Sequence, residues 1–262
     1  GANGTGDGQN GVAKSAAALI VEITMRLENE NFDFSHFDNG EGAIDVVILI
    51  VAGKGGNLNP GNYFWPHMYV VPTSEGGLED FNQDAPSNSA GYFYPGGVAI
   101  HKYIVIQEKY AWSHPGTGVG FIHPIGTICH ELGHVLGLPD LYDNSDNPKA
   151  GIGEWGLMGS GNYLRQTSPA YMSAWSRYRL GFIEPEILEN VSNLEISIPP
   201  AEGLDGSAYI LPMNSNLPQE YLIIENRQKE GSDKHLTKSG LLVWHIDETI
   251  TDMYPVFSSS VN

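Results

Sequence analysis

The sequence predicts an α+β protein, because helical and strand patterns occupy separate stretches of its 262 residues. Residues 12–31 repeat apolar side chains at the three-and-four spacing of an amphipathic helix. Residues 121–138 are expected to form a second helix, since Gly137 and Pro139 are the usual stop signals. Residues 44–51 are apolar apart from Asp45, as in a buried strand. These three observations place at least one strand between two helices.

The remaining elements follow from the same patterns. A third helix is expected at 169–180, with proline near its start and glycine just after its end. The segments 57–97 and 140–162 are rich in glycine, asparagine and proline and are predicted to be largely loops. Short strands are expected at 68–71 and 103–107, and after Pro185 at 194–198, 208–211, 221–226 and 241–246.

Composition excludes several classes of protein. Thirteen Lys and Arg residues against 31 Asp and Glu residues give a formal net charge of −18. We expect no nucleic-acid partner, because such binding needs a positive surface that displaces counterions. We expect no membrane span, because no run of 18 apolar residues occurs. Cys129 is the only cysteine, so the chain forms no internal disulfide.

The segment 127–140 carries the clearest chemical signal. His130 and His134 are four residues apart, so on a helix they lie on one face, one turn apart. Two imidazole nitrogens at that separation can bind one zinc ion. Glu131 follows the first histidine, a position that suits a general base for a zinc-activated water. The alternative interpretation is a structural pair of buried histidines.

Two histidines leave a zinc site incomplete, so a further ligand must come from outside the helix. Gly137 allows the chain to leave the helix with a positive φ, and Asp140 can then return its carboxylate to the metal. A water molecule in the remaining position would make the site catalytic. Asp143 and Asp146 are candidate calcium ligands, and a solvated turn is the equal alternative.

The run from His130 to Asp143 resembles the immune inhibitor A group of secreted bacterial metallopeptidases, peptidase family M6. The resemblance extends over most of residues 12–250. It includes a segment with a methionine turn (155–161), the helix that follows it (173–182) and two downstream strands (225–228 and 240–248). It also includes an upstream loop with the first strand (38–55).

The resemblance implies a metzincin-like zincin fold with a mixed twisted sheet, an active-site helix and a smaller lower subdomain, followed by short β-strands. It divides the chain into a flexible N-terminus (1–11), an upper catalytic subdomain (12–137), a lower catalytic subdomain (138–185) and a β-rich C-terminal part (186–262). A C-terminal part that is truncated is one of the two alternatives. The resemblance also implies a secreted zinc endopeptidase that acts on proteins or peptides, with Glu131 as the base.

The same resemblance assigns further residues to the site. Met158 would lie beneath the metal as its apolar base, and Asp140 would be the third ligand. Glu154 is the alternative third ligand, because it follows His134 by twenty residues, the offset of the glutamate ligand in thermolysin-like enzymes. Tyr163, five residues after Met158, is a candidate oxyanion stabiliser. The competing function is a catalytically silent zinc-containing module that binds proteins or glycans.

Overall fold

The computed structural model describes residues 16–54, 65–71, 95–113, 120–142, 151–165, 168–189, 192–203, 206–213 and 219–249. It contains both helices and strands, which confirms the α+β class. The described residues divide into two compact units, one ending at His123 and the other beginning at Pro124. The predicted subdomain boundary after residue 137 is a different division and stays a prediction.

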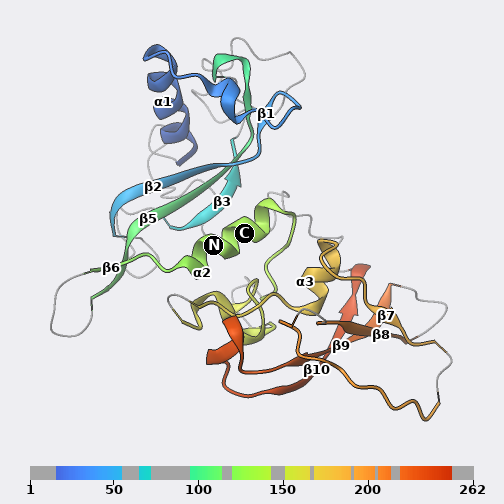
Figure 1. The fold of residues 1–262 in the computed structure, drawn as a ribbon. Helices are drawn as coiled ribbons and strands as arrows, with labels where there is room; N and C mark the ends of the chain where they lie inside the picture. The colour runs from blue at the N-terminus through green and yellow to red at the C-terminus, as the bar shows by residue number, and fades with distance from the viewer. Residues whose placement is uncertain are drawn as a thin grey trace. The chain divides into compact units, whose positions relative to one another are not determined.

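The first unit is built on a mixed sheet with strand order β2-β5-β3 (Figure 1). Strand β5 (Lys102–Ser113) runs parallel to β2 (Val47–Lys54) and antiparallel to β3 (His67–Val70). Strand β6 (Gly120–Ile122) also pairs with β5 in the antiparallel sense. The strands predicted at 44–51, 68–71 and 103–107 are thus confirmed, with shifted ends.

Helix α1 (Ala16–Asn29) supplies much of the core of the first unit. Its buried residues, among them Ile20 and Val21, pack with Tyr103 and Val105 of β5. The helical pattern predicted from residue 12 is therefore confirmed over its described part. The described part of this unit also contains four short elements: η2 (Phe34–Phe37), β1 (Ala43–Ile44), η5 (Pro95–Gly97) and β4 (Ala99–Ile100).

The second unit combines helices with a four-stranded sheet of order β10-β9-β8-β7. Strands β8, β9 and β10 are antiparallel, whereas β7 runs parallel to β8. The elements are α2 (Ile125–Val135), η6 (Gly153–Trp155), η7 (Ser160–Tyr163), α3 (Ala174–Arg179), β7 (Glu186–Ile187), β8 (Ala208–Pro212), β9 (Glu220–Arg227), η8 (Gly231–His235) and β10 (Gly240–Asp247).

The core of the second unit joins the segment after η6 to α3 and the sheet. Leu157 and Met158 pack in one cluster with Trp175 of α3 and Ile223 of β9. Cys129 of α2 packs against the same cluster, and burial raises the pKa of its thiol. The cluster therefore holds α2 and the residues around Met158 in one packed unit.

The bounds of two predicted helices and the existence of one predicted strand are corrected. Helix α2 begins at Ile125 and not at residue 121, because residues 120–122 pair with β5 and Pro124 precedes the helix. Helix α3 is confined to Ala174–Arg179. The strand predicted at 194–198 is wrong, since these residues form no strand and Leu194 is 51% exposed. They lack the buried face that would have stabilised a strand.

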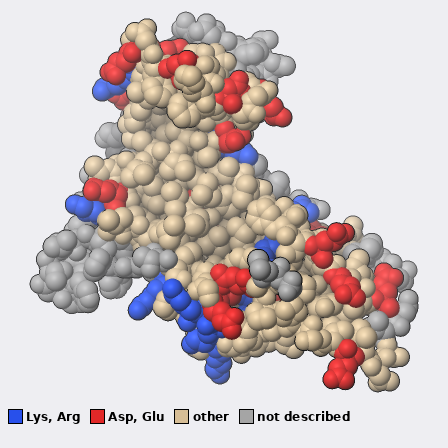
Figure 2. Space-filling model, viewed as in Figure 1, with Lys and Arg blue, Asp and Glu red and all other residues tan. Residues whose placement is uncertain are grey.

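Acidic side chains are spread over the visible face, whereas Lys and Arg gather in fewer places (Figure 2). This distribution agrees with the formal net charge of −18. None of the helices in the described part of the chain is long and apolar enough to cross a membrane.

Candidate metal centre

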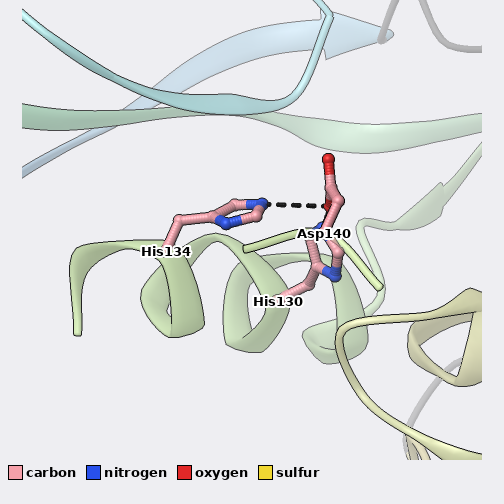
Figure 3. Close-up of side chains that lie close together, drawn as sticks. All are labelled: His130, His134 and Asp140. Atoms are coloured by element: carbon pink, nitrogen blue, oxygen red, sulfur yellow. Dashed lines mark ion pairs between the residues drawn. The ribbon is translucent and has the colours of Figure 1, made fainter. Parts of the chain in front are cut away.

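Helix α2 carries the two histidines on one face. His130 is buried, and its ring centroid lies 4.7 Å from that of His134. The four-residue spacing on a regular helix produces this pairing. Both imidazoles turn toward the carboxylate of Asp140 (Figure 3).

The turn after α2 brings Asp140 back to the helix. Gly137 has φ of 101°, a left-handed conformation that glycine adopts without steric cost. The amide of Leu138 donates to the carbonyl of Gly133 at 3.0 Å, which closes the helix end. Oδ1 of Asp140 then lies 3.0 Å from Nε2 of His130 and 3.3 Å from Nε2 of His134.

Backbone carbonyls determine which nitrogen of each imidazole carries the hydrogen in the neutral ring. Nδ1 of His130 donates to the carbonyl of Leu157 at 2.9 Å, and Nδ1 of His134 donates to that of Leu138 at 2.8 Å. Because a carbonyl can only accept, each Nδ1 carries a hydrogen. In a neutral ring, Nε2 then holds a lone pair directed at Asp140. Two nitrogen lone pairs and a carboxylate oxygen at these distances are a set of donor atoms that suits a cation.

The three atoms fit a metal with bonds of zinc length. Tetrahedral bonds of about 2.0–2.1 Å separate the ligand atoms by roughly 3.3–3.4 Å. The separations of 3.0 and 3.3 Å between Oδ1 of Asp140 and the two Nε2 atoms are close to this edge length. Within the described residues, His130, His134 and Asp140 form the group that could hold a metal ion. The carbonyl bonds to Nδ1 are the outer-shell support that metal-binding histidines usually have.

Mutual electrostatics stabilise the charged forms of these groups. Burial raises the pKa of Asp140, but hydrogen bonds and charges from His130 and His134 outweigh it and hold this pKa well below its usual range. Burial lowers the pKa of His134, but Asp140, Glu131 and the Leu138 carbonyl raise it to about 8. In the protein without a metal, His134 is therefore largely protonated at neutral pH.

Glu131 lies beside the ligand group. It follows His130 on α2, and its side chain is 7% exposed. Its negative charge contributes to the raised pKa of His134. A buried carboxylate at this position is close enough to act electrostatically on the group and is still partly accessible.

Met158 packs against α2 at Gly133. Its side chain is 1% exposed and contacts the helix at Gly133. A Cβ placed on Gly133 would overlap Sδ of Met158 and lie 3.1 Å from its Cε, so the glycine permits the close approach. The carbonyl of Met158 accepts from the amide of Leu141 at 2.9 Å. The segment 157–158 thus supports both His130 and the turn that carries Asp140.

The other predicted site residues are not members of this group or lie outside the described residues. Oε1 of Glu154 accepts from the amide of Thr237 at 2.9 Å, and the structure does not bring this carboxylate to the two histidines. Tyr163 lies in η7 and is 48% exposed. Asp143 and Asp146, the candidate calcium ligands, lie outside the described residues.

Tyr142 contacts the site and was not predicted as a site residue. Its ring stacks on His130, with centroids 6.3 Å apart and planes 25° apart. Burial raises the pKa of its hydroxyl, and the charge and hydrogen bond of Asp140 raise it further. The sequence contained one signal for this contact: Tyr142 follows Asp140 by two residues, so the turn that brings Asp140 to the helix also brings the Tyr142 ring to His130.

Comparison with known proteins identifies the family. A family model of the immune inhibitor A peptidase M6 catalytic domain matches residues 9–187. Immune inhibitor A of Bacillus thuringiensis subsp. alesti is 26% identical over 194 residues, which cover 68% of this chain and 25% of that protein. The pre-pro-metalloprotease PrtV of Vibrio cholerae serotype O1 (strain M66-2) is 26% identical over 162 residues, which cover 56% and 15%.

The chain therefore spans a quarter or less of the length of these curated relatives. The family match, by contrast, extends over most of the chain and includes the whole ligand group on α2 and the turn after it. The chain belongs to the immune inhibitor A family of metallopeptidases, peptidase family M6.

Proposed function

We propose that this chain is the catalytic part of a zinc-dependent endopeptidase that hydrolyses peptide bonds of proteins outside the cell. The single observation that carries this function is the convergence of two imidazole Nε2 atoms and one carboxylate oxygen beside Glu131. Family membership supports peptide hydrolysis, and the extracellular setting rests on the resemblance to secreted relatives.

The zinc ligands in this proposal are His130, His134 and Asp140. The hydrogen-bonded Nδ1 atoms favour this set, because they leave each Nε2 lone pair for a cation. Glu154 is the weaker candidate, since its carboxylate already accepts from the Thr237 amide. A bound zinc ion would lower the pKa of a water molecule toward about 7 and polarise the scissile carbonyl.

Glu131 is the proposed general base. Its carboxylate takes a proton from the attacking water and delivers it to the leaving nitrogen, so one side chain serves both halves of the reaction. The carbonyls of Leu157 and Leu138 keep the two imidazoles oriented while this proton moves. Met158 forms the apolar floor, and Tyr163 is the proposed donor to the oxyanion. We further propose the metzincin-like division into an upper and a lower subdomain.

Metal analysis and casein digestion of one preparation test this function. We expect about one zinc per chain and cleavage that a zinc chelator abolishes. Glu131→Gln should keep the zinc and lose cleavage by several orders of magnitude, because the amide cannot accept the proton. Glu154→Gln is the matched control and should retain both properties.

The other outcomes are equally informative. Zinc without cleavage in the unaltered chain would favour the catalytically silent binding module. Near-normal turnover by Glu131→Gln would contradict its role as base, and an absence of zinc would make the two histidines a structural pair.

A further inference from the structure

Four charged side chains are buried together in the second unit. Arg177, Glu225, Arg227 and Asp233 are each at most 2% exposed. We call them the buried charge cluster. Two of them are cations and two are anions, so the formal charges of the cluster balance. Glu225 and Arg227 come from β9, whereas Arg177 belongs to α3 and Asp233 to η8.

Ion pairs link the members of the cluster. Arg227 donates from Nε and Nη2 to the two carboxylate oxygens of Asp233, each at 2.6 Å. Arg177 donates from Nη2 to Oε2 of Glu225 at 3.0 Å. Nη1 of Arg227 lies 3.6 Å from Oε1 of Glu225, which joins the two pairs.

The cluster also binds the backbone of neighbouring segments. Nη1 of Arg227 donates to the carbonyl of Trp155 at 2.6 Å, and its Nη2 donates to that of Tyr171 at 3.2 Å. Arg177 donates to the carbonyl of Ala201 at 3.2 Å. Buried ion pairs are seldom more stabilising than well-packed apolar residues, because desolvation offsets their attraction. Their directional bonds to carbonyls, however, fix positions that apolar side chains could not fix.

The carbonyl of Trp155 lies on the segment that supports the metal ligands. Two residues later, the carbonyl of Leu157 accepts from Nδ1 of His130. The next carbonyl, that of Met158, accepts from the amide of Leu141, the neighbour of Asp140. A displacement of Trp155 would therefore reach two of the three ligands through backbone hydrogen bonds.

We propose that Arg227 is a positioning residue for the metal centre. Its guanidinium holds the Trp155 carbonyl and thereby fixes the segment 155–158, which orients His130 and the turn carrying Asp140. This role rests on the metal site of the proposed function. Arg227 lies beyond residue 187, where the family match ends. The sheet that follows the matched region is thus part of the support of the site.

Cobalt titration of Arg227→Lys tests this role, with Arg177→Lys as the matched control. Both variants keep a buried cation in the same cluster and lose a guanidinium bond to a backbone carbonyl. Of these two bonds, the one from Arg227 to the Trp155 carbonyl leads to the segment that supports the metal ligands. We expect Arg227→Lys to bind Co²⁺ about 10- to 100-fold more weakly, the usual effect of losing outer-shell support, with an altered visible spectrum. Arg177→Lys should bind within about threefold of the unaltered chain.

Equal Co²⁺ affinities and spectra for Arg227→Lys and the unaltered chain would overturn the role of Arg227. Equal weakening in both variants would also overturn it, because a general loss of stability would then explain the effect. A variant that does not fold leaves the decision to the unaltered chain. In the unaltered chain, coupling between the metal centre and Arg227 is reciprocal, so zinc binding should slow hydrogen exchange at Nε of Arg227. Unchanged exchange would contradict the coupling.

Hydrogen exchange without metal separates this inference from the proposed function. Arg227→Lys should speed exchange of the amides of Leu141 and Gly159, which donate to the carbonyls of Met158 and Gly156 in the segment 155–158. Arg177→Lys should leave these rates unchanged. If the unaltered chain binds no Co²⁺, the proposed function fails, and the exchange rates still decide whether Arg227 fixes the segment.

Discussion

The contact between Gly133 and Met158 allows a sharp test of how the metal centre is packed. In Gly133→Ala, the new methyl group would occupy the space of the Met158 thioether, and this side chain is only 1% exposed. The thioether therefore has little room to move. Since Met158 also holds the turn near Asp140 through its carbonyl, its displacement should disturb the site as well as the core.

Two opposing effects set the magnitude. Overpacking a core costs about 1–3 kcal/mol, and the buried setting places this contact in the upper part of that range. Alanine in place of glycine within a helix contributes roughly 0.5–1 kcal/mol of stability. We expect a net loss of about 1–2 kcal/mol in the free energy of unfolding. With Met158→Ala as the background, the overlap disappears and Gly133→Ala should stabilise by about 0.5–1 kcal/mol.

Urea unfolding of the four metal-free proteins, followed by tryptophan fluorescence, measures this cycle. Met158→Ala alone should cost about 2–5 kcal/mol, as for other buried methionines. The decisive quantity is the change in sign of the Gly133→Ala effect between the two backgrounds. The same destabilisation in both backgrounds would refute the packing of Met158 on Gly133.

Three further predictions concern the ligand group. Asp140→Asn should weaken zinc binding by more than the roughly 10- to 100-fold typical of outer-shell changes, whereas Glu154→Gln should leave it unchanged; isothermal titration with zinc compares them, and the opposite ranking would make Glu154 the ligand. In the metal-free protein, NMR titration should give His134 a pKa of about 8, which Asp140→Asn should lower; a pKa near 6.5 would contradict the contact with Asp140. Because this pKa is raised on folding, protonated His134 stabilises the metal-free fold fully below about pH 6.5, and this contribution is lost as the pH rises through about 8. The difference in unfolding free energy between the unaltered chain and His134→Gln should therefore shrink over that range, and a difference that grows with pH would show the wrong sign.

The ligand group was accessible from the sequence because its geometry is local. One helical turn is enough to place His130 and His134 on the same face of α2. The positive φ of Gly137 is enough to turn the chain so that Asp140 lies near them. The same local rules identified most strands, with ends shifted by a few residues. Strand ends depend on pairing partners, which single-sequence patterns do not contain.

The predictions failed where tertiary bonds replaced local preference. Helix α3 starts at Ala174 and not near residue 169, because the Ser173 side chain caps it. Both the amide and the carbonyl of Tyr171 are used by the buried charge cluster. Residues 194–198 have strand-like composition but remain largely exposed, so no packing stabilises a strand there.

The buried charge cluster shows a signal that was available but not used. Tyr221, Ile223, Glu225 and Arg227 occupy every second position of β9, and all four side chains are buried. Period-two alternation could have placed the two charges inside the protein. Their partners Arg177 and Asp233 come from other elements, so the pairing itself required the fold.

X-ray absorption at the zinc edge of the zinc-loaded chain tests the central claim most directly. We predict about one zinc per chain with two imidazole nitrogens at about 2.0–2.1 Å, and oxygen ligands at about 2.0–2.2 Å from Asp140 and water. Asp140→Asn should alter the oxygen shell and leave both imidazoles in place. A sulfur ligand, a third imidazole or a spectrum unchanged by Asp140→Asn would contradict the metal centre described here.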